Sequence, residues 1–255
     1  MKKGICTLPN ISVRLSPSHQ SEMVTQLLFG EQYAILEEMN DWIKIANIYD
    51  EYEGWIPQNQ FAISDKAYDE TVHCFSKRAF STAFFKNDES IIIPAASILP
   101  INNSGEIQIG GNTLNYEAPF FNPEKQQIKK EDIAENAKVF LGSPYLWGGK
   151  TFMGIDCSGL VQNAFRMSGI FLPRDSEQQA EMGETVNLIH EAEIGDIAFF
   201  DNEEGVINHA GIVIEDQQII HASGIVRIDH LDQQGIFSKT TQKYTHRLRT
   251  IKKIL

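Results

Sequence analysis

The feature that most constrains this chain is the pentad Asp156–Leu160, which reads Asp-Cys-Ser-Gly-Leu and is followed by His209 and His221 in two apolar segments. After Cys157, apolar residues recur at three- and four-residue intervals, and Gly169 follows where a helix would end. This spacing predicts a helix with Cys157 in its first turn. The free backbone amides and the positive end of the helix dipole favour a thiolate over a thiol there.

The two histidines are predicted to share one face of a β-hairpin. A three-residue loop centred on Asp216 would pair His221 with Gly211 and His209 with Ser223. Because opposite residues share a face, the histidines become diagonal neighbours, roughly 5 to 8 Å apart. A two-residue loop would put them on opposite faces. The other face would supply core residues, namely Ala210, Ile212, Ile214, Ile220 and Ala222.

Together these residues indicate nucleophilic thiol chemistry. Cys157 is the predicted nucleophile, His209 the base, and His221 the residue that orients it, while amides beside Cys157 would serve as oxyanion donors. Each residue also has an ordinary explanation, since Asp156 is a good N-cap, and buried cysteines and hydrogen-bonded strand histidines are common. Zinc is the competing use of one Cys and two His, but no second Cys or HExxH lies nearby. We therefore expect no metal and no cofactor.

Composition narrows the range of partners. A formal net charge of −12, without a Lys/Arg block, argues against nucleic acid or an anionic membrane as partner. Three cysteines without CxxC spacing predict no disulfide framework, and Cys6 and Cys74 are expected to be buried. The sequence after Met1 lacks the apolar run of a secretory signal, which leads us to expect a cytoplasmic protein.

Three segments are predicted. Short alternating apolar runs in residues 1–64 are typical of a small β-barrel, and residues 65–122 repeat the pattern less clearly. The second segment contains a strand at Ser90–Pro94 and a hairpin that turns at Gly-Gly-Asn (residues 110–112). Residues 123–255 form the predicted C-terminal domain, which opens with a helix over residues 131–141.

Six blocks in this C-terminal segment resemble the NlpC/p60 family of bacterial cell-wall cysteine peptidases. They are Tyr145-Leu-Trp-Gly-Gly-Lys, Gly154-Ile-Asp-Cys-Ser-Gly-Leu-Val, Leu172-Pro-Arg-Asp-Ser-Glu-Gln-Gln, Gly195-Asp-Ile-Ala-Phe-Phe, Asn208-His-Ala-Gly-Ile and His221-Ala-Ser. The resemblance covers about residues 125–255. It implies a papain-like α+β fold, in which a Cys-bearing helix packs on an antiparallel sheet. It also implies that Cys157, His209 and His221 are the catalytic residues.

The N-terminal stretch resembles bacterial SH3-like domains, through Val13-Arg-Leu-Ser-Pro, Ser21-Glu-Met-Val-Thr-Gln and Tyr52-Glu-Gly-Trp-Ile. One or two small SH3-like β-barrels would then precede the catalytic domain. The whole chain is similar to γ-D-glutamyl-L-diamino acid endopeptidases that recycle murein peptides. That similarity implies a small murein peptide as substrate, L-Ala-γ-D-Glu-diaminopimelate or the Lys equivalent, cleaved after γ-D-Glu and requiring a free N-terminus. We expect a monomer.

The resemblance also implies a set of substrate-binding residues. Asp175 would bind the N-terminal ammonium, with Tyr52 and Glu22 closing the pocket. The others are Tyr145 and Trp147 lining the site, Asp156 and Ser158 beside the nucleophile, and Arg174 or Ser176 for the D-Glu α-carboxylate.

Structural alternatives exist for several of these residues. Ser176 with Gln179 forms a capping box, so Asp175 and Ser176 would only start a helix. Tyr52 would be a core aromatic of a small barrel, and Arg174 would pair with a surface carboxylate. The second β-module is assigned only packing.

Three functional alternatives stay open. A hydrolase of intact peptidoglycan would share the catalytic residues but should carry an export signal. An amidase or acyltransferase would keep Cys157 and His209 for another acyl group. A non-catalytic binding protein would be expected to have lost one of them, and neither is lost.

Overall fold

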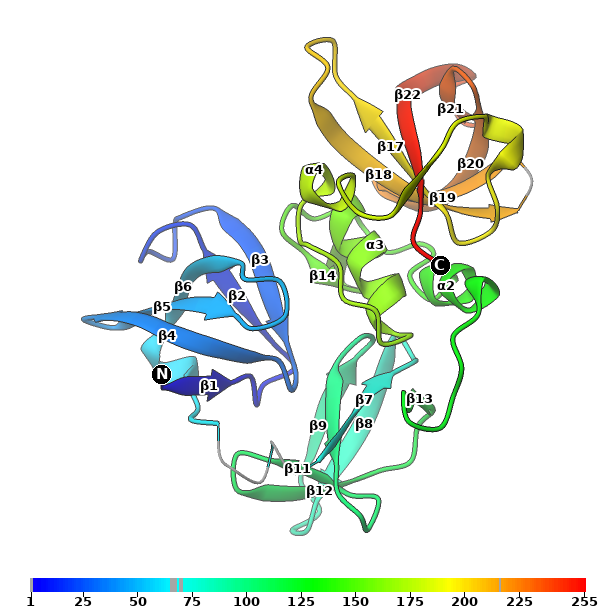
Figure 1. The fold of residues 1–255 in the computed structure, drawn as a ribbon. Helices are drawn as coiled ribbons and strands as arrows, with labels where there is room; N and C mark the ends of the chain where they lie inside the picture. Colours follow the sequence, from blue (N-terminus) through cyan, green and yellow to red (C-terminus); the bar gives the residue numbers. More distant parts are fainter. Residues whose placement is uncertain (1, 65–67, 69–70, 216) are drawn as a thin grey trace.

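The computed structural model describes residues 2–64, 68, 71–215 and 217–255, which form three β-rich units (Figure 1). The N-terminal unit is a six-stranded antiparallel sheet in the order β1-β4-β5-β6-β2-β3. Its elements are β1 Lys3–Ile5, β2 Asn10–Arg14, β3 Met23–Leu28, β4 Gln32–Met39, β5 Trp42–Asn47, β6 Glu53–Pro57 and the 3-10 helix η1 Gln58–Gln60. Alternate residues of β5 are buried, as the apolar alternation predicts.

The middle unit is a seven-stranded antiparallel sheet in the order β13-β7-β10-β11-β12-β8-β9. Its strands are β7 Val72–Ser76, β8 Phe80–Phe85, β9 Ser90–Pro94, β10 Ile98–Ile101, β11 Ile107–Ile109, β12 Asn112–Tyr116 and β13 Phe120–Phe121. The predicted strand Ser90–Pro94 is therefore confirmed. The hairpin turns at Gly110 and Gly111, both with positive φ, whereas Asn112 already pairs with Ile109. The predicted boundary between these units falls at residue 65, which lies outside the described residues.

The C-terminal unit packs helices on a curved antiparallel sheet. The helices are α2 Lys130–Lys138, α3 Cys157–Arg166 and the short α4 Ser176–Gln179, with the 3-10 helix η2 Ile189–Glu191. The strands are β14 Lys150–Thr151, β15 Gly154–Ile155, β16 Glu184–Val186, β17 Ile197–Asp201, β18 Ile207–Glu215, β19 Gln218–Ser223, β20 Ile225–Asp232, β21 Gly235–Ser238 and β22 Lys243–Lys253. The order is β16-β22-β17-β18-β19-β20-β21, and a further β21–β22 pairing closes β17 to β22 into a ring.

The core between α3 and the sheet follows from the hairpin register. Residues 210, 212 and 214 of β18 and residues 220 and 222 of β19 are buried against the apolar face of α3, as predicted. The helix begins at Cys157 with Asp156 as its N-cap, whose side chain accepts a hydrogen bond from the Gly159 amide. It ends at Arg166, before Gly169, which has a φ of +77°.

Buried charges join the N-terminal and C-terminal units. The Glu31 carboxylate is fully buried and accepts hydrogen bonds from Lys150 Nζ at 3.0 Å, from the Arg166 guanidinium and from Asn47 Nδ2 at 2.6 Å. Burial lowers the pKa of Lys150 to about 8 and that of Arg166 to about 9. Buried charged groups have lost their hydration and depend on their protein partners for stabilisation. This cluster therefore holds the two units together.

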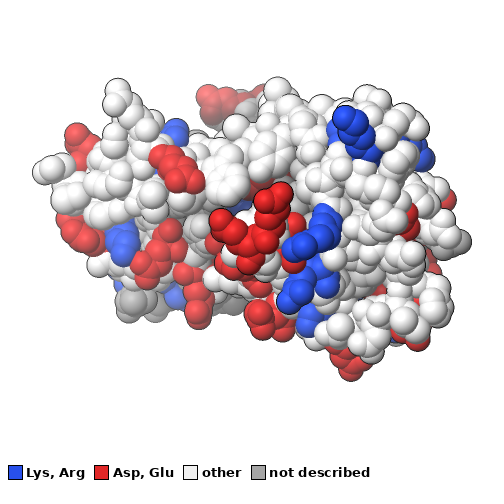
Figure 2. All heavy atoms as spheres, turned by 90° about the horizontal axis from the view of Figure 1, so that it is seen from above, with Lys and Arg blue, Asp and Glu red and all other residues white. Residues whose placement is uncertain are grey.

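The surface is predominantly acidic. Figure 2 shows acidic side chains spread over the visible face, with a group of basic side chains beside acidic ones near its centre. Within the described part of the chain, no helix is both long and apolar enough to cross a bilayer.

Glu31→Gln is expected to lower the free energy of unfolding by about 3–5 kcal/mol, because Lys150 and Arg166 would remain buried without a counter-charge. Urea denaturation measures this loss. The matched control is Glu38→Gln, which breaks an exposed ion pair with Lys2 and should cost less than about 1 kcal/mol. Equal losses in both variants would contradict a joining role for Glu31.

Candidate active site

Cys157 lies at the first position of α3 and lines a cavity of about 280 Å³. Cys157 is only 6% exposed to solvent. The backbone amides of Ala210, on β18, and of Ser158 donate hydrogen bonds to its sulfur. The nucleophile predicted from the pentad is therefore placed between the start of a helix and the strand that carries His209.

The two predicted histidines meet as the hairpin register requires. His221 pairs with Gly211, and His209 Nε2 lies 2.9 Å from His221 Nδ1. A Cβ atom on Gly211 would lie 2.9 Å from the Cβ of His221, so a larger residue would displace the ring. The loop centre chosen for this prediction, Asp216, lies outside the described residues. Both imidazoles are buried.

Two further side chains near the histidines were not found from the sequence. Asp229 Oδ2 lies 3.2 Å from His221 Nε2, and the ring of His246 stacks on that of His209 at 4.0 Å with 20° between the planes. No motif marks either residue. His246 lies on β22, a strand rich in charged residues. Asp229 lies on β20, in which apolar and charged residues are mixed. The β19–β20 register brings Asp229 to His221, and the pairing of β22 with β17 and β21 brings His246 to His209.

Ring nitrogens of His209, His221 and His246 all lie within 4.8 Å of one another. A tetrahedral ion needs lone pairs that converge, and ring lone pairs lie in the ring plane. Because the rings of His209 and His246 are nearly parallel, their lone pairs do not converge on one point. The trio differs from the Cys157-containing zinc site considered above, and its geometry fits a hydrogen-bonded chain better than a metal centre.

Burial governs the ionisation of the reactive pair. It raises the pKa of the Cys157 thiol to about 11, with Asp156 adding to the rise, although the Ala210 and Ser158 amides act in the opposite direction. Burial also holds the pKa of His209 well below its usual value, and His246 and His221 lower it further. Desolvation thus favours a neutral Cys157 thiol and a neutral His209 imidazole, in the opposite direction to the thiolate expected from the helix start. Desolvation outweighs the helix dipole at this position.

Asp156 organises the backbone around the nucleophile. Its Oδ1 accepts from the Gly159 amide at 2.7 Å and from Arg174 at 3.0 Å, and its Oδ2 accepts from the Gly148 amide at 2.8 Å and from Arg174 at 2.6 Å. Arg174 is 1% exposed, and its Nε donates to Thr25 on β3. The proposed surface pairing of Arg174 is thus wrong, because its partner is a buried carboxylate.

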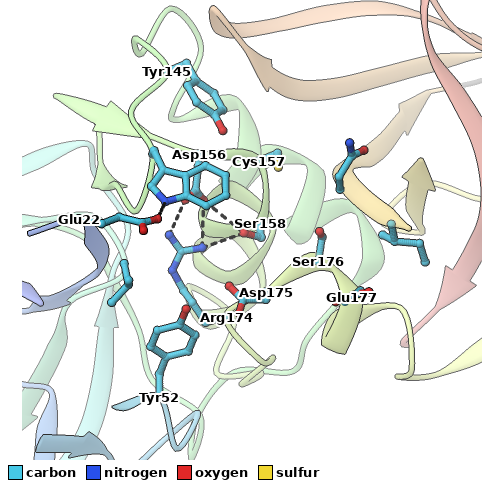
Figure 3. A pocket seen from close by; sticks show the side chains of 14 residues that line it. Glu22, Tyr52, Tyr145, Asp156, Cys157, Ser158, Arg174, Asp175, Ser176 and Glu177 are labelled. Atoms are coloured by element: carbon cyan, nitrogen blue, oxygen red, sulfur yellow. Dashed lines mark hydrogen bonds and ion pairs between the residues drawn. The ribbon is translucent and has the colours of Figure 1, made fainter. Parts of the chain in front are cut away.

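Every substrate-binding residue predicted from the sequence lines the same cavity as Cys157 (Figure 3). The complete lining is Glu22, Val24, Tyr52, Tyr145, Trp147, Asp156, Cys157, Ser158, Arg174, Asp175, Ser176, Glu177, Ile207 and Asn208. Val24, Glu177, Ile207 and Asn208 were not predicted. The N-terminal unit supplies one wall, where Trp147 Nε1 donates to Glu22 Oε1 at 2.5 Å across the junction of the units.

Asp175 lines the part of the cavity to which both units contribute. It occupies the N-cap position of α4, but its side chain makes no capping hydrogen bond, and the predicted Ser176–Gln179 capping box is not formed. Gln179 instead donates to the carbonyls of Ser158 and Pro173. The Asp175 carboxylate accepts a hydrogen bond from the Tyr52 hydroxyl, whose pKa burial raises to about 12. Tyr52 therefore faces the site and is not a barrel-core residue.

A buried thiol at a helix start, backed by a histidine chain on an antiparallel sheet, defines a cysteine peptidase. Residues 142–247 match the model of the NlpC/P60 family, and residues 13–61 match that of the bacterial dipeptidyl-peptidase SH3 domain. The C-terminal unit therefore belongs to the NlpC/P60 family of cysteine peptidases, and a bacterial dipeptidyl-peptidase SH3 domain precedes it. These matches confirm the family and fold class predicted from the sequence.

Two curated relatives are similar over most of this chain. The chain is 27% identical over 223 residues to a γ-D-glutamyl-L-lysine dipeptidyl-peptidase of Bacillus subtilis, covering 82% of this chain and 75% of that protein. It is 25% identical over 244 residues to dipeptidyl-peptidase 6 of Lysinibacillus sphaericus, covering 86% and 88%. The crystal structure of an NlpC/P60 family protein from Bacillus cereus superposes with a TM-score of 0.86 at 18% identity and covers 99% of both chains, which shows the shared fold.

Alkylation of Cys157 by iodoacetamide is expected to accelerate steadily from pH 7 to pH 10, because the thiolate fraction grows about tenfold per pH unit below the raised pKa. The rate is measured by mass spectrometry. Cys157→Ala reports the background from the buried Cys6 and Cys74. A rate that is already constant between pH 5 and pH 8 would show a preformed thiolate–imidazolium pair and contradict the neutral resting state.

Proposed function

We propose that the protein hydrolyses the bond after γ-D-Glu in short murein peptides that begin with a free L-Ala and continue with an L-diamino acid. The observation that carries the proposal is the acidic lining of the cavity, where Asp175 of one unit interacts with Tyr52 of the other. The name of the Bacillus subtilis relative, a γ-D-glutamyl-L-lysine dipeptidyl-peptidase, supports the same bond and the release of a dipeptide.

The charge of the cavity favours a cationic peptide end. Four carboxylates line it, those of Glu22, Asp156, Asp175 and Glu177, against one guanidinium, that of Arg174. Asp156 already neutralises Arg174 through two hydrogen bonds, which leaves the other carboxylates in excess. An N-terminal ammonium placed against Asp175 would offset part of this excess negative charge. An acylated N-terminus would bring no charge, and an N-terminal extension would move the ammonium away from Asp175. Both would meet the wall that carries Glu22 and Tyr52.

The proposed mechanism starts from a neutral Cys157 thiol and a neutral His209 imidazole, the forms that burial favours. His209 takes the proton of Cys157 while the sulfur attacks the γ-carbonyl carbon of D-Glu, and the amides at the start of α3 stabilise the oxyanion. Tyr145, whose pKa burial raises to about 12, stays protonated and can donate a further hydrogen bond. Collapse of the intermediate leaves a thioester, and His209 delivers the proton to the departing amine. Water, activated by His209, then releases the dipeptide and the free thiol.

The direct test is mass spectrometry of products from L-Ala-γ-D-Glu-diaminopimelate and from its N-acetylated form. We expect cleavage of the free peptide only, abolished by Cys157→Ala. Equal cleavage of both peptides would leave a peptidase but contradict recognition of the N-terminus. Cleavage of neither would favour an amidase or acyltransferase that uses another substrate.

Asp175→Asn should reduce kcat/KM for the free peptide by about 10- to 100-fold, the size of a charged hydrogen bond, because its amide cannot balance the ammonium. Initial rates by chromatography measure the loss. Glu181→Gln, which removes an exposed carboxylate just beyond α4, is the matched control and should keep wild-type rates. A similar loss in both variants would point to general electrostatics and not to a binding contact.

A role in cytoplasmic recycling is also proposed. It is supported by the expected preference for small free peptides over peptides still joined to glycan. Immunoblotting of fractionated cells would test the location, and size-exclusion chromatography would test the expected monomer.

A further inference from the structure

Asp229 is a buried carboxylate that the thiol chemistry described above does not use. It lies on β20 and its side chain is 3% exposed. Its Oδ2 accepts from Arg227 Nε at 2.8 Å and lies 3.2 Å from His221 Nε2, and its Oδ1 accepts from the Lys239 amide at 3.2 Å. Every oxygen of the carboxylate therefore faces a donor, and together these donors hold the pKa of Asp229 far below its usual value.

The strand register brings Asp229 to His221. Residue 221 on β19 pairs with Arg227, and Asp229 follows two positions later on the same face of β20. It is therefore a diagonal neighbour of His221. It faces the imidazole nitrogen Nε2, whereas His209 faces Nδ1. Among the described residues, His246 stacks on His209, and Arg227, which pairs with Asp229, lowers the pKa of both histidines through its charge.

The carboxylate dictates where each ring carries its proton. An ionised carboxylate can only accept, so His221 must present N–H at Nε2 and a lone pair at Nδ1. The 2.9 Å contact from that lone pair then requires N–H at Nε2 of His209. The remaining ring nitrogen of His209, Nδ1, is left with its lone pair free to take the thiol proton.

We propose that Asp229 is a positioning residue and the fourth member of the chain Cys157–His209–His221–Asp229, and that it acts through His221. A neutral imidazole alone can carry its proton on either nitrogen, and the Nδ1–H form of His221 would oppose the Nε2–H of His209. Asp229 removes that choice. It also places a negative charge beyond the imidazolium that forms on His209 during the reaction. This inference rests on the proposed peptidase function.

The first readout needs no turnover, so it can fail separately from the proposed function. Nitrogen-15 NMR of labelled histidines should show His209 and His221 as Nε2–H tautomers in the wild type. Asp229→Asn should give His221 a mixture of tautomers, because an amide can donate as well as accept. The control is Arg227→Gln, which keeps the carboxylate and should keep the wild-type tautomers. An unchanged His221 signal in Asp229→Asn would overturn the proposal.

The second readout is a double-mutant cycle on peptide cleavage. Asp229→Asn should lower kcat by about 10- to 100-fold with KM nearly unchanged, the size of one charged hydrogen bond. In a His221→Asn background the same change should cost less than about twofold, since residues that act as a unit are not additive. Thermal unfolding would establish that each variant folds. An equal loss in both backgrounds would show that Asp229 does not act through His221, and wild-type kcat in Asp229→Asn would also overturn the proposal.

Discussion

The buried ion pair between Asp156 and Arg174 is the interaction on which the rest of the site depends. One carboxylate caps the helix that starts at Cys157 and also holds the Gly148 amide, in the loop that carries Trp147. Its partner reaches Thr25 of the N-terminal unit. A single pair thus sets the helix start, one wall of the cavity and the contact between units, and neither residue has charge left to bind substrate strongly.

Burial shapes the chemistry as much as the identity of the residues does. A thiol at a helix start would be expected to ionise, yet at 6% exposure desolvation acts in the opposite direction and raises the pKa of Cys157. The same burial lowers the pKa of His209. Burial therefore favours the uncharged forms of both side chains.

The sequence alone was sufficient for local features with strong periodicity. It predicted the helix start at Cys157, the shared face of His209 and His221, and the family, which the comparisons confirm. Two features depend on strand pairings that no motif marks. Asp229 reaches His221 through the register of the β19–β20 hairpin, and His246 reaches His209 because the distant strand β22 pairs with β17 and β21. The Ser176 capping box was predicted wrongly because tertiary hydrogen bonds of Gln179 outweighed local preference. The thiolate stays a prediction, and burial of Cys157 acts against it. The roles of the cavity residues stay predictions.

We propose that the two units together form an acidic pocket that binds a peptide N-terminus. A crystal structure of Cys157→Ala with bound L-Ala-γ-D-Glu-L-Lys tests it most directly. We expect the ammonium of L-Ala to lie within hydrogen-bond distance of Asp175, beside Tyr52. We expect the γ-carbonyl of D-Glu to lie at the start of α3. A peptide bound in the opposite direction, or with its N-terminus in solvent beyond the N-terminal unit, would contradict it.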